Sequence, residues 1–279
     1  MAAEGIPIYD NHVHLRPDGR GMEALKEFQA AGGTGITLVN LPYPQIPVDG
    51  LNDILDSYRL TMAQAMQARE LPGLEVNVAI GPYPVLLMTL EERHGLESAE
   101  AIMTAAVDCA LDLVREGEAQ AIGEVGRPHF PVPEPIWQAS NRILFHAMCG
   151  AAEIACPVII HSESAVPEAM AEFASMADRA GLDRGRVVKH FSGPLNRPEM
   201  CHGVLPSMPA SRKALREALD NGGPFLLETD YIDDPQRPGA VMSINSVPKR
   251  VKAALSNGEM DERTAWSIGE DIPRRLYRP

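Results

Sequence analysis

The chain has 279 residues, of which 45% are hydrophobic and 23% are charged, and its formal net charge is −13. This length suits one large buried core, so we treat residues 1–279 as a single domain. The negative charge disfavours nonspecific attraction to nucleic acids and anionic membranes, although it is compatible with a local basic pocket. No apolar run approaches the roughly 20 residues needed to span a bilayer. Residues 1–5 lack the basic and apolar regions of a signal peptide, so we expect none.

Short β-like runs alternate with amphipathic helical stretches along the whole chain. The predicted strands, in chain order, are 6–10, 36–40, 76–80, 119–124, 157–161, 187–190, 201–205 and 225–230; the seventh is weak because Pro206 follows it. The predicted helices are 22–31, 51–69, 99–114, 137–152, 167–180, 212–221, 247–257 and 261–268.

Several of these helices have recognisable ends. Gly32 follows the first helix, Pro167 fits the first turn of the fifth, Gly181 follows it, and Ser211 can cap the sixth. Strands that alternate with helices imply parallel pairing with right-handed crossovers. Eight such strands predict an α/β fold, a single (β/α)₈ TIM-type barrel; a doubly wound open sheet is the alternative.

Two histidines, His12 and His14, follow the first apolar run. Alternate side chains of an extended strand share a face, so both imidazoles point the same way and form half of a divalent-metal site. Four later strands also end in ligand-type residues, namely Glu124, His161, His190 and Asp230.

The carboxyl ends of barrel strands open on one face, so we expect all six side chains to converge there. Four imidazoles and two carboxylates suit two divalent ions with one carboxylate as a bridge. Taken singly, each has another interpretation: a hydrogen-bonded rim histidine, a salt bridge between Glu124 and Arg127, or a turn capped by Asp230.

These motifs resemble the TatD-related metal-dependent hydrolases of the amidohydrolase superfamily over nearly the whole chain. The similar segments are residues 10–15 (DNHVHL), 123–126 (GEVG), 157–162 (PVIIHS), 190–193 (HFSG), 227–230 (LETD), 246–248 (SVP) and 274–277 (RRLY). The resemblance implies that His12, His14 and Asp230 hold one metal, that His161 and His190 hold the second, and that Glu124 bridges them.

The chain departs from the family pattern in its substrate-facing segments. Glu163 replaces an arginine that family members carry after the strand-five histidine, and Arg127-Pro128 replaces Leu-Asp. The strand-six motif lacks one residue, and Tyr231 begins a different continuation after strand eight. These changes leave the ligand set intact but weaken the transfer of nuclease activity.

The residues favour a hydrolase that cleaves phosphoester bonds, of nucleotides or DNA ends, with a metal-bridged hydroxide and Asp230 as the catalytic proton-transfer group. Asp230 acting only as a ligand is the alternative role. The alternative functions are hydrolysis of a lactone, ester or amide by the same metals, and noncatalytic metal binding. Zn²⁺ is the first choice of cofactor, ahead of Mn²⁺, Fe²⁺, Ni²⁺ or Mg²⁺.

Two residues after the fourth strand are candidates for substrate binding. The fork of Arg127 suits a phosphate or carboxylate, although an ion pair with Glu134 or another acid would use the same group. His129 lies in a predicted loop and is placed to contact substrate or simply to lie on the surface. The expected partner is a small anionic substrate, with no membrane; the charge does not support nucleic acid.

Three further expectations concern supporting residues. By strand alternation, Lys189 lies between the barrel and its helices, and Glu228 shares the face of Asp230 and supports a ligand histidine or forms an internal salt bridge. The four cysteines, none in a C-x-x-C pair, predict free thiols and a cytoplasmic location.

Overall fold

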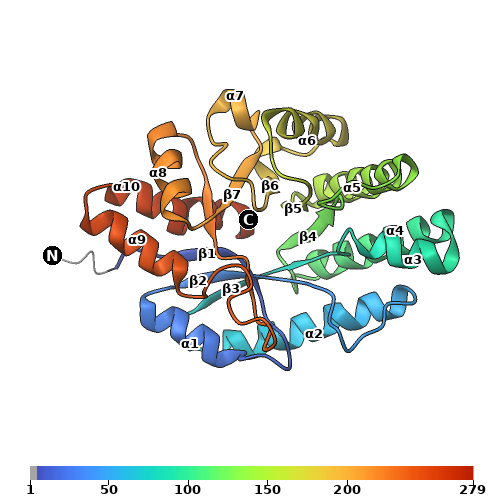
Figure 1. Ribbon diagram of the computed structural model, residues 1–279, viewed down its shortest axis with the longest axis horizontal. Coiled ribbons are helices and arrows are strands. Elements are labelled where there is room, and N and C mark those ends of the chain that lie inside the picture. Colours follow the sequence, from blue (N-terminus) through green and yellow to red (C-terminus); the bar gives the residue numbers. More distant parts are fainter. Residues whose placement is uncertain (1–4, 279) are drawn as a thin grey trace.

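The computed structural model describes residues 5–278, in which a ring of parallel strands is surrounded by helices (Figure 1). Residues 1–4, where the sequence predicts no signal peptide, and residue 279 lie outside this description. The strands are β1 (Tyr9–His14), β2 (Gly35–Val39), β3 (Glu75–Ile80), β4 (Ala121–Gly126), β5 (Val158–His161), β6 (Val187–Lys189), β7 (Leu205–Pro209), β8 (Leu226–Glu228) and β9 (Tyr231–Ile232).

The helices follow the strands in alternation. They are α1 (Met22–Ala31), α2 (Leu51–Arg69), α3 (Leu86–His94), α4 (Leu96–Arg115), α5 (Glu134–Ile154), α6 (Pro167–Ala180), η1 (Arg184–Arg186), α7 (Pro198–Cys201), α8 (Arg212–Asn221), α9 (Ser246–Ser256), α10 (Glu262–Trp266), η2 (Ser267–Asp271) and α11 (Ile272–Tyr277). No helix in the described range 5–278 is long and apolar enough to cross a membrane.

The strands form a nearly closed barrel, which confirms the predicted TIM-type fold. Their order is β8-β7-β6-β5-β4-β3-β2-β1-β9, and every pairing is parallel. The chain leaves β8, turns at Asp230 (φ 48°) and continues as β9, which pairs with β1 through Val13 and Tyr231. This turn lets one continuous segment contact β7 on one side and β1 on the other.

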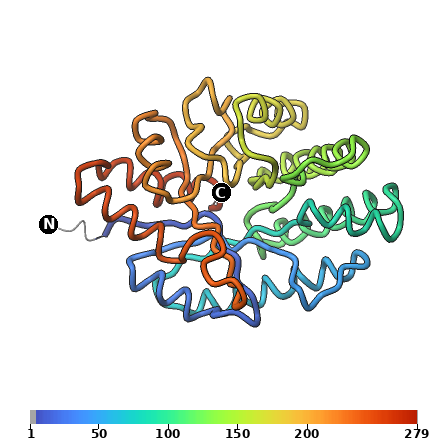
Figure 2. The backbone as a smooth tube through the Cα atoms, viewed as in Figure 1, coloured from blue at the N-terminus to red at the C-terminus, as the bar shows by residue number. Residues whose placement is uncertain are grey.

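One apolar side chain from each of the eight main strands fills the barrel interior: Tyr9, Val39, Ala79, Ala121, Ile159, Val188, Leu205 and Leu226. The last helix, α11, packs into the same cluster through Ile272, Leu276 and Tyr277, and the end of the described chain lies near the centre of the ring (Figure 2). Tyr277 stacks on Tyr9, the first residue of β1, with ring centroids 6.1 Å apart. The amino end of the barrel is therefore filled, which leaves the carboxyl end for a site.

Four predicted strands have the wrong bounds. The fourth covers Ala121–Gly126 rather than 119–124. The first strand covers Tyr9–His14 rather than 6–10. Several of its buried side chains are polar, so a search for runs of hydrophobic residues does not detect this part of the strand. The seventh strand covers Leu205–Pro209 rather than 201–205, because the short helix α7 ends at Cys201. Pro206 is the second residue of this strand, close to its start, where proline is tolerated. The eighth ends at Glu228 and is followed by a turn at Asp230.

The four helix ends predicted from Gly32, Pro167, Gly181 and Ser211 are confirmed. Other helices differ: α4 and α5 each begin three residues earlier than predicted, and the sequence pattern does not predict α3, η1, α7 or α11. Ser211 accepts a hydrogen bond from the backbone N–H of Ala214, and Pro167 occupies the first turn of α6. Gly32 and Gly181 end α1 and α6 in the left-handed region, which glycine enters without a Cβ clash.

Candidate metal centre

Register shifts in two strands turn three of the predicted ligands into the barrel. Tyr9 and Ala121 point inward, so strict alternation would turn His12, His14 and Glu124 outward. The pairing of β1 shifts between Asp10 and Val13, and that of β4 between Ile122 and Val125. Such irregularities re-aim the side chains that follow them. His12, His14 and Glu124 consequently face the barrel axis at its carboxyl end.

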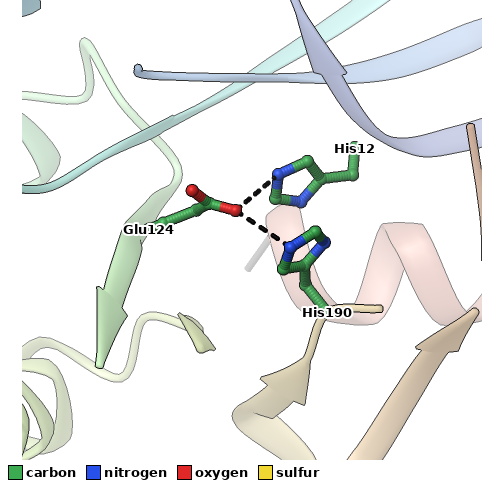
Figure 3. A group of neighbouring side chains, drawn as sticks. All are labelled: His12, Glu124 and His190. Carbon is green, nitrogen blue, oxygen red and sulfur yellow. Dashed lines mark ion pairs between the residues drawn. The ribbon is translucent and has the colours of Figure 1, made fainter. Parts of the chain in front are cut away.

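Glu124 lies at the centre of the site, between imidazoles from different strands (Figure 3). Its Oε1 is 3.0 Å from His12 Nε2 and 3.1 Å from His190 Nε2. His161 Nδ1 lies 3.4 Å from the same oxygen. One carboxylate oxygen thus faces three imidazole nitrogens, and the bridging role of Glu124 stays a prediction.

The remaining predicted ligands continue this series of close contacts. His12 Nε2 is 3.1 Å from His14 Nε2, which confirms that the two imidazoles share a face. His14 Nε2 is in turn 3.5 Å from Asp230 Oδ1. Two groups therefore have ligand atoms within 4.8 Å of one another: His12, Glu124 and His190, and His12, His14 and Asp230. His12 belongs to both groups, whereas the resemblance placed it in only one.

Three features of the site fit divalent ions. The ligand set of imidazoles and carboxylates is the one that borderline divalent metals prefer. Within the described chain, the buried Nδ1 atoms of His12 and His161 have no hydrogen-bond partner. The carboxylates of Glu124, Glu228 and Asp230 also lie at or next to this cluster. Cations held by these residues would satisfy Nδ1 of His161, which faces Glu124, and would offset the carboxylate charges. His12 faces the site with Nε2, so its unpartnered Nδ1 lies on the other side of the ring.

A fully buried carboxylate, Glu228, fixes His190. Its Oε1 accepts hydrogen bonds from His190 Nδ1 (3.0 Å) and from the backbone N–H of Phe191 (2.8 Å), and its Oε2 accepts one from Ser207 Oγ (2.5 Å). With Nδ1 occupied, His190 presents Nε2 to Glu124. Glu228 therefore holds a histidine of the site, as predicted, and this contact is also the internal salt bridge given as its alternative; metal binding by His190 stays a prediction.

A hydrogen-bonded chain connects this carboxylate with the C-terminal helix. Asn11 Nδ2 donates to Ser207 Oγ (3.1 Å), and Tyr277 Oη donates to Asn11 Oδ1 (2.7 Å). His14 is held separately, since its Nδ1 donates to the carbonyl oxygen of Val39 (2.9 Å). The imidazoles are therefore oriented before any ligand arrives.

Asp10, on β1, connects this strand with the turn that follows β8. Its carboxylate accepts hydrogen bonds from the backbone N–H (2.9 Å) and the hydroxyl (2.7 Å) of Thr229, at the turn that carries Asp230. Burial raises the pKa of Asp10 to about 7, although the bonds from Thr229 and from the backbone of His12 lower it. Asp10 thus anchors the turn and is not itself placed among the ligand groups.

The site's electrostatics favour ionised carboxylates. Burial raises the pKa of Glu124, but the nearby charges of His161 and His190 and the hydrogen bond from His12 outweigh it, so the net pKa lies well below the usual range. Burial raises the pKa of Asp230 likewise, and His14 and His190 reverse this, leaving the pKa below its ordinary value. Both groups are negative at neutral pH.

The same charges act in the opposite sense on His190. Burial alone would lower the pKa of His190. The negative charges of Glu228 and Glu124 raise the pKa by more than burial lowers it, to about 9. Coordination needs the neutral imidazole, so an ion that binds there displaces a proton.

The guanidinium of Arg127 is occupied by contacts with other side chains of the protein. Its Nε donates to Asn141 (2.8 Å), and its terminal nitrogens pair with Glu163 (3.0 Å) and Glu172 (2.8 Å). The guanidinium also stacks on Trp137, 4.3 Å from the ring centroid. The structure therefore shows the alternative ion-pair role, with these acids instead of Glu134, and substrate binding by Arg127 stays a prediction without a supporting contact.

His129 and Lys189 take different positions. His129 is exposed, and its Nδ1 lies 3.0 Å from Nε2 of His161, so it borders the site. Lys189 is buried outside the barrel interior, as predicted, and its Nζ donates to the carbonyl oxygen of His190 (2.6 Å). Burial lowers the pKa of Lys189 to about 8.

The sequence reasoning missed Tyr83. Its ring lies edge-on against His161 with centroids 4.9 Å apart, and burial, followed by the charges of Glu124 and Asp230, raises its pKa above the ordinary value. Tyr83 follows β3, whose end carries no imidazole or carboxylate. The rule that located the other residues, a polar side chain just after a strand, would have found it had hydroxyl groups been included.

Comparison with known proteins decides the family. Residues 9–278 match the sequence model of the family described as TatD related DNase. An uncharacterized protein of Methanocaldococcus jannaschii is 34% identical over 98% of this chain and 96% of its own length. This chain belongs to the TatD-related family. The resemblance proposed from the sequence motifs is thereby confirmed.

Several solved structures, two of them of TatD-like proteins, share the fold. The TatD homologue YjjV of Escherichia coli K12 is 19% identical, covers 98% of both chains and gives a TM-score of 0.66. A TatD-like protein of Archaeoglobus fulgidus is 16% identical, covers 97% of this chain and 100% of its own, and gives 0.64. A mutant PTE-like lactonase of Deinococcus radiodurans is 16% identical, covers 99% and 97%, and gives 0.60.

Proposed function

We propose that this TatD-related protein is a metal-dependent hydrolase that holds two divalent ions and cleaves phosphoester bonds. The observation that carries the proposal is the continuous line of ligand groups, from Asp230 through His14 and His12 to Glu124. His190 and His161 flank Glu124 on the far side. Zn²⁺ is the first candidate for both positions because imidazole and carboxylate ligands suit it.

Each residue has a separate task in the proposed reaction. Ions bound at these ligands would supply Lewis-acid activation of a water and of the scissile group. Asp230, which is ionised at neutral pH, accepts the proton of the attacking water and passes it to the leaving oxygen. Glu228 keeps His190 oriented through its Nδ1–H, and Val39 does the same for His14.

The substrate we propose is a small phosphoester, such as a nucleotide or a DNA end, and not a long duplex. The family description names a DNase, which supports phosphoester chemistry. The net charge of −13 opposes the multiple phosphate contacts on which tight DNA binding depends. Glu163 adds a carboxylate where the resemblance leads us to expect an arginine, and it is paired with Arg127.

A carbonyl substrate, such as a lactone, ester or amide, is the second candidate. The observation that favours it is the engagement of Arg127, whose guanidinium has three protein acceptors. A neutral substrate would not need this cation. The same residues would hold the ions, which would supply stabilisation of negative charge on the carbonyl oxygen.

The test begins with metal content and continues with a substrate panel. We expect about two Zn²⁺ per chain after purification in metal-supplemented buffer, and hydrolysis of phosphomonoesters or short phosphodiesters. Hydrolysis of lactones alone would move the second candidate to first. Absence of bound metal would refute the proposal, and metal without turnover on any substrate would indicate a noncatalytic binding protein.

We also propose that the protein works in the cytoplasm. The four cysteines, Cys109, Cys149, Cys156 and Cys201, are free thiols. Burial raises the pKa of Cys156 to about 12, which keeps that thiol protonated and unreactive. A reducing compartment suits such a set of cysteines.

A further inference from the structure

The ligand imidazoles differ in what holds their second nitrogen. His14 donates its Nδ1–H to the carbonyl oxygen of Val39, and His190 donates its Nδ1–H to Glu228. Each of these bonds leaves Nε2 as the nitrogen that faces the other ligands. His161 is turned the other way: its Nδ1 faces Glu124 at 3.4 Å, and its Nε2 lies 3.0 Å from Nδ1 of His129.

Only one proton arrangement of this last pair leaves His161 able to bind an ion. If His161 carried its proton on Nδ1, the nitrogen that faces Glu124 would have no lone pair to offer. With the proton on Nε2, that N–H donates to Nδ1 of His129, and Nδ1 of His161 is free. Within the described residues this Nδ1 has no hydrogen-bond partner, as a ligand atom awaiting an ion would.

The chain between β4 and α5 is built to bring His129 to this place. Gly126 (φ 138°) lies so close to β5 that a Cβ would collide with the carbonyl oxygen of His161. The N–H of Arg127 donates to that same oxygen (2.8 Å), and its guanidinium is fixed by Glu163 and Glu172. His129 follows two residues later, with its ring edge-on against Phe130. Arg127 therefore acts as the anchor of the loop that carries His129.

We propose that His129 is a positioning residue for the metal centre: by accepting the Nε2–H of His161, it selects the Nδ1 atom of His161 as the ligand of the second ion. This inference rests on the proposed function, because it assumes that His161 is a metal ligand. It replaces the predicted substrate contact of His129 with a specific partner. The imidazole of His129 would thus accept a hydrogen bond from His161, as the carboxylate of Glu228 accepts one from His190.

The test compares metal binding by the metal-stripped chain and two variants, titrated with Zn²⁺ alone. In His129→Ala the acceptor is lost, and we expect the weaker-bound ion to lose about 10- to 100-fold in affinity while the other is retained. In His129→Asn the amide oxygen takes the place of Nδ1, and affinity should return to within a few-fold of the wild type. His146→Ala is the matched control, since His146 is an exposed histidine paired with Asp108.

A second measurement separates positioning from direct ligation. With Co²⁺ in place of Zn²⁺, the visible ligand-field spectrum of His129→Asn should match that of the wild type, because the ligands are the same. A changed spectrum would make His129 a ligand and overturn the positioning role. Equal Zn²⁺ affinity of His129→Ala and wild type, or failure of His129→Asn to rescue, would also overturn it. The proposed function fails separately if the wild type does not bind two ions.

Discussion

Replacing Glu228 by glutamine removes one buried negative charge next to the metal centre with almost no change in shape. The side chain is fully buried and accepts three hydrogen bonds. An amide oxygen can still accept from His190 and from the N–H of Phe191. The amide nitrogen would face Ser207, whose hydroxyl now donates to Glu228 and would have to turn.

The size of the effect follows from these contacts. Loss of an outer carboxylate partner typically weakens metal binding by about 10- to 100-fold, which is about 1.4–2.7 kcal/mol. The turned Ser207 hydroxyl adds a loss of fold stability of about 1–2 kcal/mol, the usual cost of one buried unsatisfied group. The pKa of His190 should fall from about 9, because Glu228 is the largest influence that raises it.

The assay is titration of metal-stripped Glu228→Gln with Zn²⁺, with thermal unfolding to confirm that the variant is folded. The matched control is Glu217→Gln, which removes an exposed carboxylate from α8. The control should bind both ions as the wild type does. If folded Glu228→Gln also binds both ions within twofold of the wild type, the reasoning that Glu228 orients and charges His190 is refuted.

Three further predictions concern other residues. Asp230→Asn should lower turnover by at least about 100-fold while the fold stays intact, and near-full turnover with metal bound would contradict the proton-transfer role. Arg127→Met should reduce the free energy of unfolding by about 1 kcal/mol, because it removes two ion pairs whose carboxylates, on Glu163 and Glu172, are partly exposed; an unchanged urea midpoint would argue against the anchor. The pKa of Lys189 falls from 10.5 to about 8 on folding, so between these pH values only the unfolded chain keeps this proton, and Lys189 contributes a gain in stability of about 3 kcal/mol as pH rises. Other groups, such as Cys156, titrate in both chains, so the prediction concerns the difference in unfolding free energy between the wild type and Lys189→Met, which should change by this amount in urea unfolding between pH 7 and 11.

The sequence determined the architecture because local patterns report local structure. Helix ends such as Gly32, Pro167 and Ser211 were readable since they depend on one residue's backbone freedom or one capping bond. The alternation of strands and helices required a parallel sheet, and the strand-end rule then located the polar residues of the site. His12, His14, Glu124, His190 and Asp230 are brought together as this rule predicts.

What the sequence missed are features that depend on contacts between distant segments. The first strand includes Asp10 and Asn11, whose partners Thr229 and Ser207 lie about two hundred positions away, so a hydrophobic pattern placed the strand too early. The short seventh strand and the turn at Asp230 are likewise set by pairing with neighbouring strands and not by propensity.

The roles of the residues around the ligands were decided by the tertiary structure alone. The guanidinium of Arg127 has the chemistry of an anion-binding group, but Glu163 and Glu172 pair with it. Only the tertiary structure shows that these two acids lie beside Arg127. His129 and Tyr83 lie against His161 because a loop and a strand end converge there. The sequence by itself named the candidate ligand residues and the barrel that gathers them. The structure decided which nitrogen of His14, His190 and His161 faces the other candidate ligands, because that depends on what the second nitrogen of each ring contacts.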